Sequence, residues 1–332
     1  MINLSTKYLG LDLRNPIIAA SSGLTETLVQ IRELEEKGIG AVVLKSIFEE
    51  EIAAELNRRI VNSNKPSTIY PEIYDAFDYS DIEDSVSKYL FLIQEAKATM
   101  KIPVIASINC VSSDEWILFA KRIQDAGADA LELNMFILPS DFNRTGQENE
   151  NVYFDVINRV KSVVTIPVSI KISYYFSNLG TMIQKLSQTG IQGIVLFNRF
   201  YSPDIDIDNM KINPTNIFSK PSDLSMSLRW IAIMAKRVNC DLAASTGIHD
   251  GEAVIKQLLA GANAVQIASV LYKHGNDKIT EMLNFITKWM QEKDYQSIDD
   301  FRGKMAQVET KNPAAYERVQ FMTHFAGKRA NS

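Results

Sequence analysis

Two lysines stand where they could bind an electron-rich ligand. Lys45 and Lys171 each end an otherwise apolar segment, AVVLK and PVSIK respectively. An unpaired charge inside a protein is costly, so a lysine on an inner wall needs an anionic or electron-rich partner. A bound ligand would meet that need. The alternative is a structural carboxylate, for which Glu132 is the obvious candidate.

Two small-residue turns indicate a phosphate site. Thr246–Gly247 and Ala268–Ser269 each follow an apolar segment, within the stretch DLAASTGIHDGEAVIKQLLAGANAVQIAS. Backbone N–H groups in turns of this kind, together with a helix start, bind phosphate. Ordinary turn formation is the alternative explanation. We expect His249, beside the first turn, to be a surface or helix-capping residue rather than a catalytic base.

Other reactive side chains are scarce. The chain has only 2 Cys and 3 His among 332 residues, which excludes a disulfide scaffold, a Cys/His zinc site and an iron–sulfur cluster. No metal site is predicted. The net charge of -5 also argues against nucleic-acid binding. Redox chemistry in this chain would therefore need a bound cofactor.

The sequence predicts a cytoplasmic protein that does not enter a membrane. Its start, MINLSTKYLGLDLRNP, lacks the basic and apolar segments of a signal peptide. No stretch approaches the roughly 20 apolar residues that cross a bilayer. Cys110 and Cys240 lie in or beside apolar segments, and we expect them to be reduced, buried thiols.

These residues belong to an alternating pattern of strands and helices. Parallel strands buried on both faces appear as short apolar segments separated by amphipathic helices. Eight such units favour a closed (β/α)8 barrel over an open sheet. The predicted strands are 16–20, 41–46, 103–108, 130–134, 167–172, 193–198, 241–245 and 264–268. The predicted helices are 28–37, 80–100, 114–126, 152–163, 179–189, 224–238, 251–260 and 279–292.

A parallel barrel gathers the ends of its strands on one face, where active sites are built. A phosphate site after strands seven and eight, with lysines on strands two and five, predicts FMN lying across the barrel mouth. Its phosphate would lie at the two small-residue turns, and its ring against the end of the first strand. This placement predicts Ala20, Ser21, Lys45, Lys171, Thr246, Gly247, Ala268 and Ser269 as cofactor-binding residues.

Three segments depart from the barrel pattern. Residues 48–80 and 201–223 follow strands and are long, so we expect each to be a lid or a subunit contact. Residues 304–332 lie beyond the last helix. We therefore expect an FMN-binding barrel over 1–303 and a C-terminal extension over 304–332 that packs on it.

The ordered motifs resemble those of the dihydroorotate dehydrogenase family. They are LGLDLRNPIIAASSG, AVVLKS, GADALELN, PVSIKIS and LAASTGIHDGEAVIKQLLAGANAVQIASVLYKHG, and the resemblance covers roughly residues 3–305. The match is best to the cytoplasmic, FMN-containing class 1 branch, which is typically dimeric. The resemblance implies FMN, a homodimer, a flavin contact from Lys171, and an Asn134 that faces flavin and substrate. It also implies that Ser46, Asn109, Asn134 and Asn198 belong to the cofactor-binding residues. It implies no iron–sulfur partner subunit.

The substrate half of the site departs from the family. The family follows ELN with Leu-Ser-Cys-Pro-Asn, and its Cys, or a Ser in its place, is the catalytic base. Here the segment is ELNMFILPSDF, so Phe136 and Ile137 occupy that region and neither can accept a proton. Ser140 could serve if the loop has shifted. Tyr70, Tyr74 and Tyr175 are the other candidates.

The sequence thus predicts an FMN-dependent oxidoreductase acting on CH–CH bonds. The family reaction oxidises dihydroorotate to orotate in pyrimidine biosynthesis, and here Lys45, Asn134 and Ser140 would be its catalytic residues. Three alternatives stay open. They are a different small cyclic amide as substrate, a flavin-binding protein without turnover, and a barrel isomerase or aldolase that uses Lys171 as a Schiff base.

Overall fold

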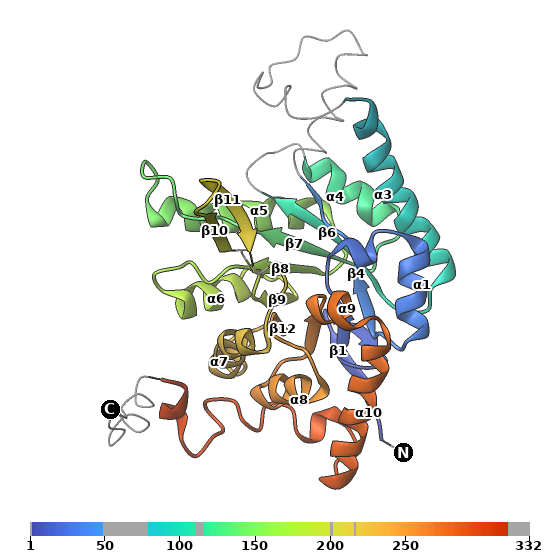
Figure 1. Cartoon of the computed structure of the whole chain (residues 1–332), viewed down its shortest axis with the longest axis vertical. Helices are drawn as coiled ribbons and strands as arrows, with labels where there is room; N and C mark the ends of the chain where they lie inside the picture. The colour runs from blue at the N-terminus through green and yellow to red at the C-terminus, as the bar shows by residue number, and fades with distance from the viewer. Residues whose placement is uncertain (1, 49–78, 111–115, 200–201, 216, 318–332) are drawn as a thin grey trace.

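The structure, a computed structural model, describes residues 2–48, 79–110, 116–199, 202–215 and 217–317. Within them, eight parallel strands form a closed barrel, which confirms the predicted (β/α)8 fold (Figure 1). The barrel closes because β4 (Ala41–Val43) pairs with β6 (Val104–Cys110). A short strand, β5 (Ile47–Phe48), also pairs with β6. The strands are β3 (Ile17–Ala19), β4 (Ala41–Val43), β6 (Val104–Cys110), β7 (Ala130–Met135), β8 (Val168–Ile172), β9 (Gly193–Leu196), β12 (Asp241–Ser245) and β13 (Ala264–Ile267).

Helices cover the outside of the barrel (Figure 1). The α-helices are α1 (Leu28–Glu36), α3 (Tyr79–Thr99), α4 (Trp116–Asp125), α5 (Gly146–Val163), α6 (Leu179–Ser187), α7 (Leu224–Met234), α8 (Gly251–Ala260), α9 (Ser269–His274) and α10 (Asp277–Glu292). Short 3-10 helices span Gly23–Thr25, Pro221–Asp223, Ile298–Asp300 and Pro313–Tyr316. Helix α5 begins earlier than predicted, because Thr145 and Glu148 form a capping box there.

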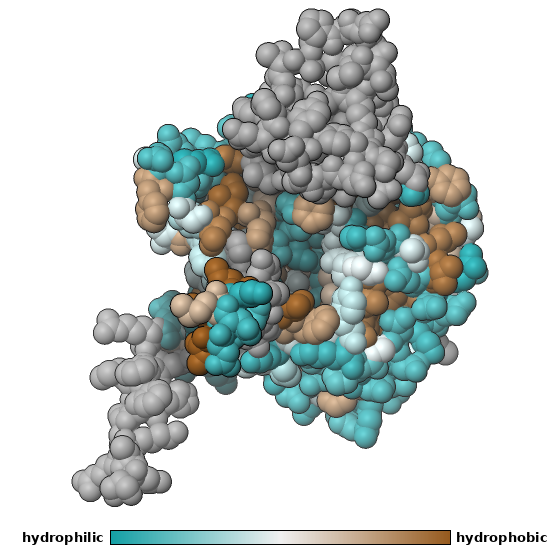
Figure 2. Space-filling model, turned by 45° about the horizontal axis from the view of Figure 1, so that its top comes forward, coloured by the Kyte–Doolittle hydropathy of each residue, from teal (hydrophilic) through white to brown (hydrophobic). Residues whose placement is uncertain are grey.

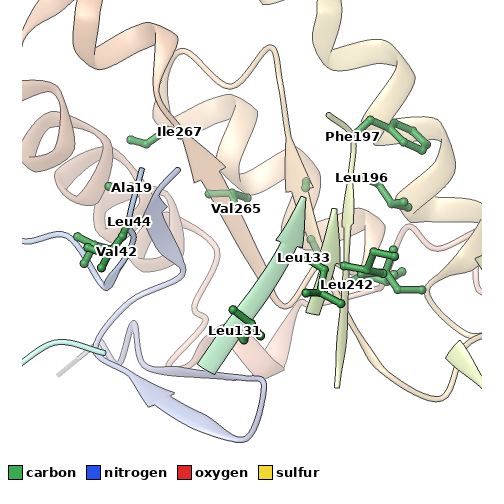
Figure 3. Close-up of a cluster of buried hydrophobic side chains, with 14 of the residues drawn as sticks. Ala19, Val42, Leu44, Leu131, Leu133, Leu196, Phe197, Leu242, Val265 and Ile267 are labelled. Carbon is green, nitrogen blue, oxygen red and sulfur yellow. The ribbon is translucent and has the colours of Figure 1, made fainter. Parts of the chain in front are cut away.

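The alternation of side chains along the strands creates two separate cores. One set faces outward and packs under the helices, as Figure 3 shows for Ala19, Leu131 and Val265. The other set faces inward and includes Ile18 and Ile105. Above this apolar inner layer, the inward positions become polar. The barrel interior is therefore apolar at one end and polar at the mouth.

An N-terminal hairpin closes the apolar end. Strands β1 (Thr6–Tyr8) and β2 (Leu11–Leu13) pair in antiparallel fashion. Tyr8, Leu9 and Leu13 are at most 1% exposed and pack against the inner layer. This hairpin is not among the elements predicted from the sequence. Its effect is to leave the opposite, strand-end face for ligand binding.

A second hairpin lies within 201–223, one of the segments that depart from the barrel pattern. Strands β10 (Ser202–Asp206) and β11 (Lys211–Thr215) pair in antiparallel fashion and form a two-stranded sheet of their own. The hairpin lies near the N-terminal part of α5 (Figure 1). Its repeated Asp and Asn residues obscure a strand pattern in the sequence, and its apolar side chains remain exposed.

The described part of the C-terminal extension contacts the barrel helices. The Met305 N–H donates to the Leu259 carbonyl at 2.8 Å, and the Gln307 N–H donates to the Ala232 carbonyl at 2.8 Å. Within the described ranges, we find no helix that is long and apolar enough to span a membrane, and no cluster of metal-ligating side chains. The predicted lid at 48–80 falls almost entirely outside the described residues.

Candidate active site

A cleft of about 320 Å³ opens at the strand ends of the barrel. Such a volume lies within the range of small-ligand sites. Lys171 and Arg199 are the charged residues that line it, and no carboxylate is among its described lining residues; Asp223, outside this lining, lies 3.6 Å from Arg199. The lining includes eight predicted cofactor-binding residues: Ala20, Ser21, Lys171, Asn198, Thr246, Gly247, Ala268 and Ser269. This charge balance suits an anionic ligand.

A network of hydrogen bonds runs around the mouth of the barrel. The hydroxyl of Ser46 lies 3.0 Å from that of Ser21 and 2.7 Å from that of Ser107. The Asn134 amide donates to Ser46 Oγ at 3.5 Å and accepts from the Asn198 amide at 2.5 Å. Four predicted residues, from four strand ends, are thus joined into one polar rim.

Lys171 lines the cleft and is the first of three buried side chains that are joined by hydrogen bonds. Its Nζ donates to Gln266 Oε1 at 2.9 Å, and Gln266 Nε2 donates to Glu132 Oε2 at 2.5 Å. Lys171 Nζ lies 4.0 Å from Glu132 Oε1. Burial raises the pKa of Glu132 and lowers the pKa of Lys171, while the attraction between the two charges opposes both shifts. The predicted Lys171–Glu132 pairing therefore forms, but mainly through Gln266.

The turn after β12 has an unusual backbone. Thr246 and Gly247 have φ values of +76° and +80°, and the Thr246 hydroxyl donates to the Phe197 carbonyl at 3.2 Å. After β13, Ser269 Oγ accepts the backbone N–H of Ser219 at 3.0 Å. Both predicted phosphate turns therefore lie along one edge of the same cleft.

The prediction that His249 is a surface or helix-capping residue is wrong, because it is neither exposed nor a cap. It is 9% exposed, and its Nε2 lies 3.0 Å from Ser219 Oγ. Asp250 is the residue that caps α8. Burial lowers the pKa of His249, and the positive charge of Lys273 lowers it further. The His249 ring thereby holds Ser219, whose N–H donates to Ser269 in the second predicted phosphate turn.

Lys45 corrects another prediction, because it does not lie buried on the inner wall. Strand β4 ends at Val43, and the Lys45 side chain is exposed and lies 2.5 Å from Glu26. It lines a separate cavity of about 410 Å³ together with Ser46 and Tyr89. The pattern of strand residues could not reveal this, since the strand stops three residues earlier than predicted.

Two comparisons with known proteins identify the family. The sequence profile of dihydroorotate dehydrogenase matches residues 3–290, most of the chain. The chain belongs to the dihydroorotate dehydrogenase family. Similar relatives include proteins named dihydroorotate dehydrogenase B (NAD(+)), catalytic subunit. The one from Thermoplasma volcanium is 27% identical over 314 residues, covering 91% of this chain and 98% of the relative. The one from Methanocaldococcus jannaschii is 26% identical, covering 87% and 94%.

A solved structure supports the fold of this dihydroorotate dehydrogenase family member. The crystal structure of DHODH from Eimeria tenella in complex with ferulenol superposes with a TM-score of 0.64 at 16% identity. It covers 91% of this chain and 88% of that one. Family membership supports an oxidoreductase acting on CH–CH bonds, in a family that generally binds flavin.

The loop that carries the family's base lies beside a second cavity. Ile137 lines this cavity of about 400 Å³ with Tyr174 and Tyr175, whose rings are 4.9 Å apart. Ser140 is exposed and lines neither this cavity nor the cleft. Tyr175 is thus the predicted base candidate that shares a cavity with Ile137.

Several predicted residues fall outside these groups. Asn109 is half-buried at the end of β6, in register with Asn134, but does not line the cleft. Tyr70 and Tyr74 lie outside the described residues. Arg199, by contrast, lines the cleft and donates to the Ile217 carbonyl at 2.7 Å. Its place directly after Asn198 is the sequence signal for it, but no role follows from that signal alone.

Proposed function

We propose that this chain is an FMN-dependent oxidoreductase that acts on a small cyclic amide related to dihydroorotate. The observation that carries the proposal is the cleft itself. It combines the Lys171 ammonium, the Arg199 guanidinium and the two phosphate turns, without a lining carboxylate. A phosphorylated, electron-rich cofactor matches that set of donors.

The residues of the cleft would divide the work of holding FMN. Thr246–Gly247 and Ala268–Ser269 would bind the phosphate, and Ala20–Ser21 would contact the ring. Lys171 would face its electron-rich edge. When bound, FMN supplies the hydride acceptor for oxidation of the substrate. The linked amides of Asn134 and Asn198 would orient the substrate through hydrogen bonds.

Oxidation of a CH–CH bond also requires an acceptor for the proton. Ile137 cannot accept it, and the exposed Ser140 requires a movement of its loop. Tyr175 lines the same cavity as Ile137, so we propose it as the first residue to test in this role. A changed base and a changed loop favour a substrate other than dihydroorotate. Dihydroorotate itself is our second candidate substrate.

Two measurements on the purified protein test the proposal. We expect the flavin absorbance of bound FMN, and a colourless protein that cannot be reconstituted with FMN would overturn the cofactor assignment. We also expect anaerobic bleaching by one member of a panel of dihydropyrimidines and related cyclic amides. Bleaching by dihydroorotate would assign the family reaction. Bleaching by no member would favour a flavin-binding protein without turnover.

We propose further that the chain forms a homodimer through the β10–β11 hairpin. An isolated hairpin is marginally stable in water, so its apolar face needs a cover. Ile205 and Ile212 are register partners on one face and are 66% and 77% exposed. Ile207 and Met210, also in the hairpin segment, are 80% and 86% exposed, and Figure 2 shows hydrophobic surface on the upper-left side of the molecule.

Light scattering tests this assembly. We expect Ile205→Lys to convert a dimer into a monomer, whereas Asp204→Lys leaves the dimer intact, because Asp204 lies on the other face. A monomeric wild type would refute the proposal. A dimer that Ile205→Lys leaves unchanged would place the interface elsewhere. The relatives are named catalytic subunits, so an added partner subunit would show as a larger complex.

A further inference from the structure

Glu132 is a buried charge directly behind the wall of the cleft. It is 0% exposed and does not line the cleft. Its Oε2 accepts from Gln266, while its Oε1 has no hydrogen-bond partner among the described residues. Burying a carboxylate that is only partly satisfied is costly. An apolar residue would fill this position in the strand at lower cost.

The carboxylate is aimed at one charge in particular. The register pairs Asn134 with Lys171 across β7 and β8, so Glu132 lies two residues deeper on the same inner wall. From there it is 4.0 Å from Lys171 Nζ and holds Gln266, which in turn accepts from Lys171. Lys171 and Gln266 line the cleft, and Glu132 lies behind them.

We propose that Glu132 is a positioning residue that orients Lys171 through Gln266 and compensates its charge, so that the floor of the cleft is nearly neutral. When Glu132 is ionised, the pair carries no net charge. When Glu132 is protonated or replaced by a neutral residue, the floor carries the full charge of Lys171. The carboxylate thereby controls how strongly the cleft favours an anionic form of the bound group.

The surroundings of Glu132 support such control. The charged or titratable side chains that act on it are Lys171 from β8, Tyr8 from β1 and Tyr89 from α3. Burial raises the pKa of both tyrosines, so neither supplies a competing negative charge. Lys171 is therefore the charge to which Glu132 responds.

The inference rests on the proposed FMN site, and its test measures redox properties rather than turnover. Midpoint potentials of free and bound FMN yield the ratio of its dissociation constants in the oxidised and reduced states. We expect Glu132→Gln to raise the preference for reduced FMN at least about tenfold, or about 30 mV for a two-electron couple, in the pH range where Glu132 is ionised and Lys171 keeps its proton. The wild type and the variant should converge at low pH, where Glu132 is protonated.

Ser169→Ala is the matched control, because Ser169 is the register partner of Glu132 but takes no part in the chain to Lys171. It should keep the wild-type ratio. If Glu132→Gln does not fold, Gln266→Leu decides. Loss of the Gln266 hydrogen bond raises the pKa of Glu132, so the cleft should favour reduced FMN up to a higher pH than in the wild type.

The outcomes separate the two proposals. A wild type that does not bind FMN contradicts the proposed function. The role of Glu132 is overturned if the protein binds FMN but the ratio of the oxidised and reduced dissociation constants has one and the same pH profile in three proteins. These are the wild type, Glu132→Gln and Gln266→Leu. A shift caused equally by Ser169→Ala also overturns it, because any change in the buried layer would then have the same effect.

Discussion

Substitution of Gly247 by alanine tests how the fold builds the phosphate edge of the cleft. Gly247 has a φ of +80°, and an added Cβ would lie 2.0 Å from the backbone nitrogen of Leu224, where α7 begins. Gly10 is a matched control, since its φ is +76° but an added Cβ has no atom within 4 Å. Both alanine variants adopt a left-handed conformation at a cost of about 1–2 kcal/mol. Only Gly247→Ala adds overpacking, at about 1–3 kcal/mol more.

Two assays measure the effect of the substitution on stability and on FMN binding. Denaturant unfolding without FMN should show Gly247→Ala to be less stable than Gly10→Ala by about 1–3 kcal/mol. Titration with FMN should show at least about tenfold weaker binding for Gly247→Ala alone, because either the turn or the start of α7 must move. Equal stability of the two variants, with wild-type FMN affinity in both, would refute the reasoning.

Three further predictions follow from individual side chains. We expect Lys45→Ala to change the free energy of unfolding by at most about 1 kcal/mol, because its pair with Glu26 is exposed, and to leave FMN affinity unchanged in a fluorescence titration, because Lys45 lines a separate cavity and not the cleft; weaker FMN binding by the variant would show that Lys45 reaches the cofactor. Because the folded-state pKa of His249 is lowered, stability should fall as pH drops through about 6.5, and His249→Gln, which can keep the contact with Ser219, should melt with less pH dependence. Identical pH profiles in thermal melts would contradict this. Ile137→Cys should not restore dihydroorotate turnover, because the surrounding substrate loop also differs from the family; rapid anaerobic bleaching by that variant would show the loop to be adequate.

The strands and helices of the barrel could be predicted because each carries a periodic signal. The eight strands and α8 lie within a few residues of their predicted positions, since a buried parallel strand is apolar throughout and a helix end is marked by its caps. The β10–β11 hairpin escaped prediction, because Asp, Asn and Pro residues interrupt its short strands and its apolar residues remain exposed. Pairing within the hairpin, rather than burial in a core, holds those strands together.

In the candidate site, too, some residues carry a local sequence signal and others are placed only by tertiary contacts. Lys171 and the turn at Thr246–Gly247 could be selected from the sequence, because each follows the end of a recognisable strand. Lys45 follows the same rule but points elsewhere, since β4 ends at Val43 and Glu26 attracts its side chain. A charge of opposite sign only 2.5 Å away outweighs the direction expected from strand alternation.

The sequence by itself determined the barrel, the family and the scarcity of groups that could perform redox chemistry without a cofactor. Tertiary structure alone decided which polar side chains meet. Gln266 and Glu132 are 134 residues apart in the chain, yet their side chains lie 2.5 Å apart inside the barrel. Closure of the sheet brings strands β7, β8 and β13 around one interior, so the partner of Lys171 depends on geometry that no local spacing records.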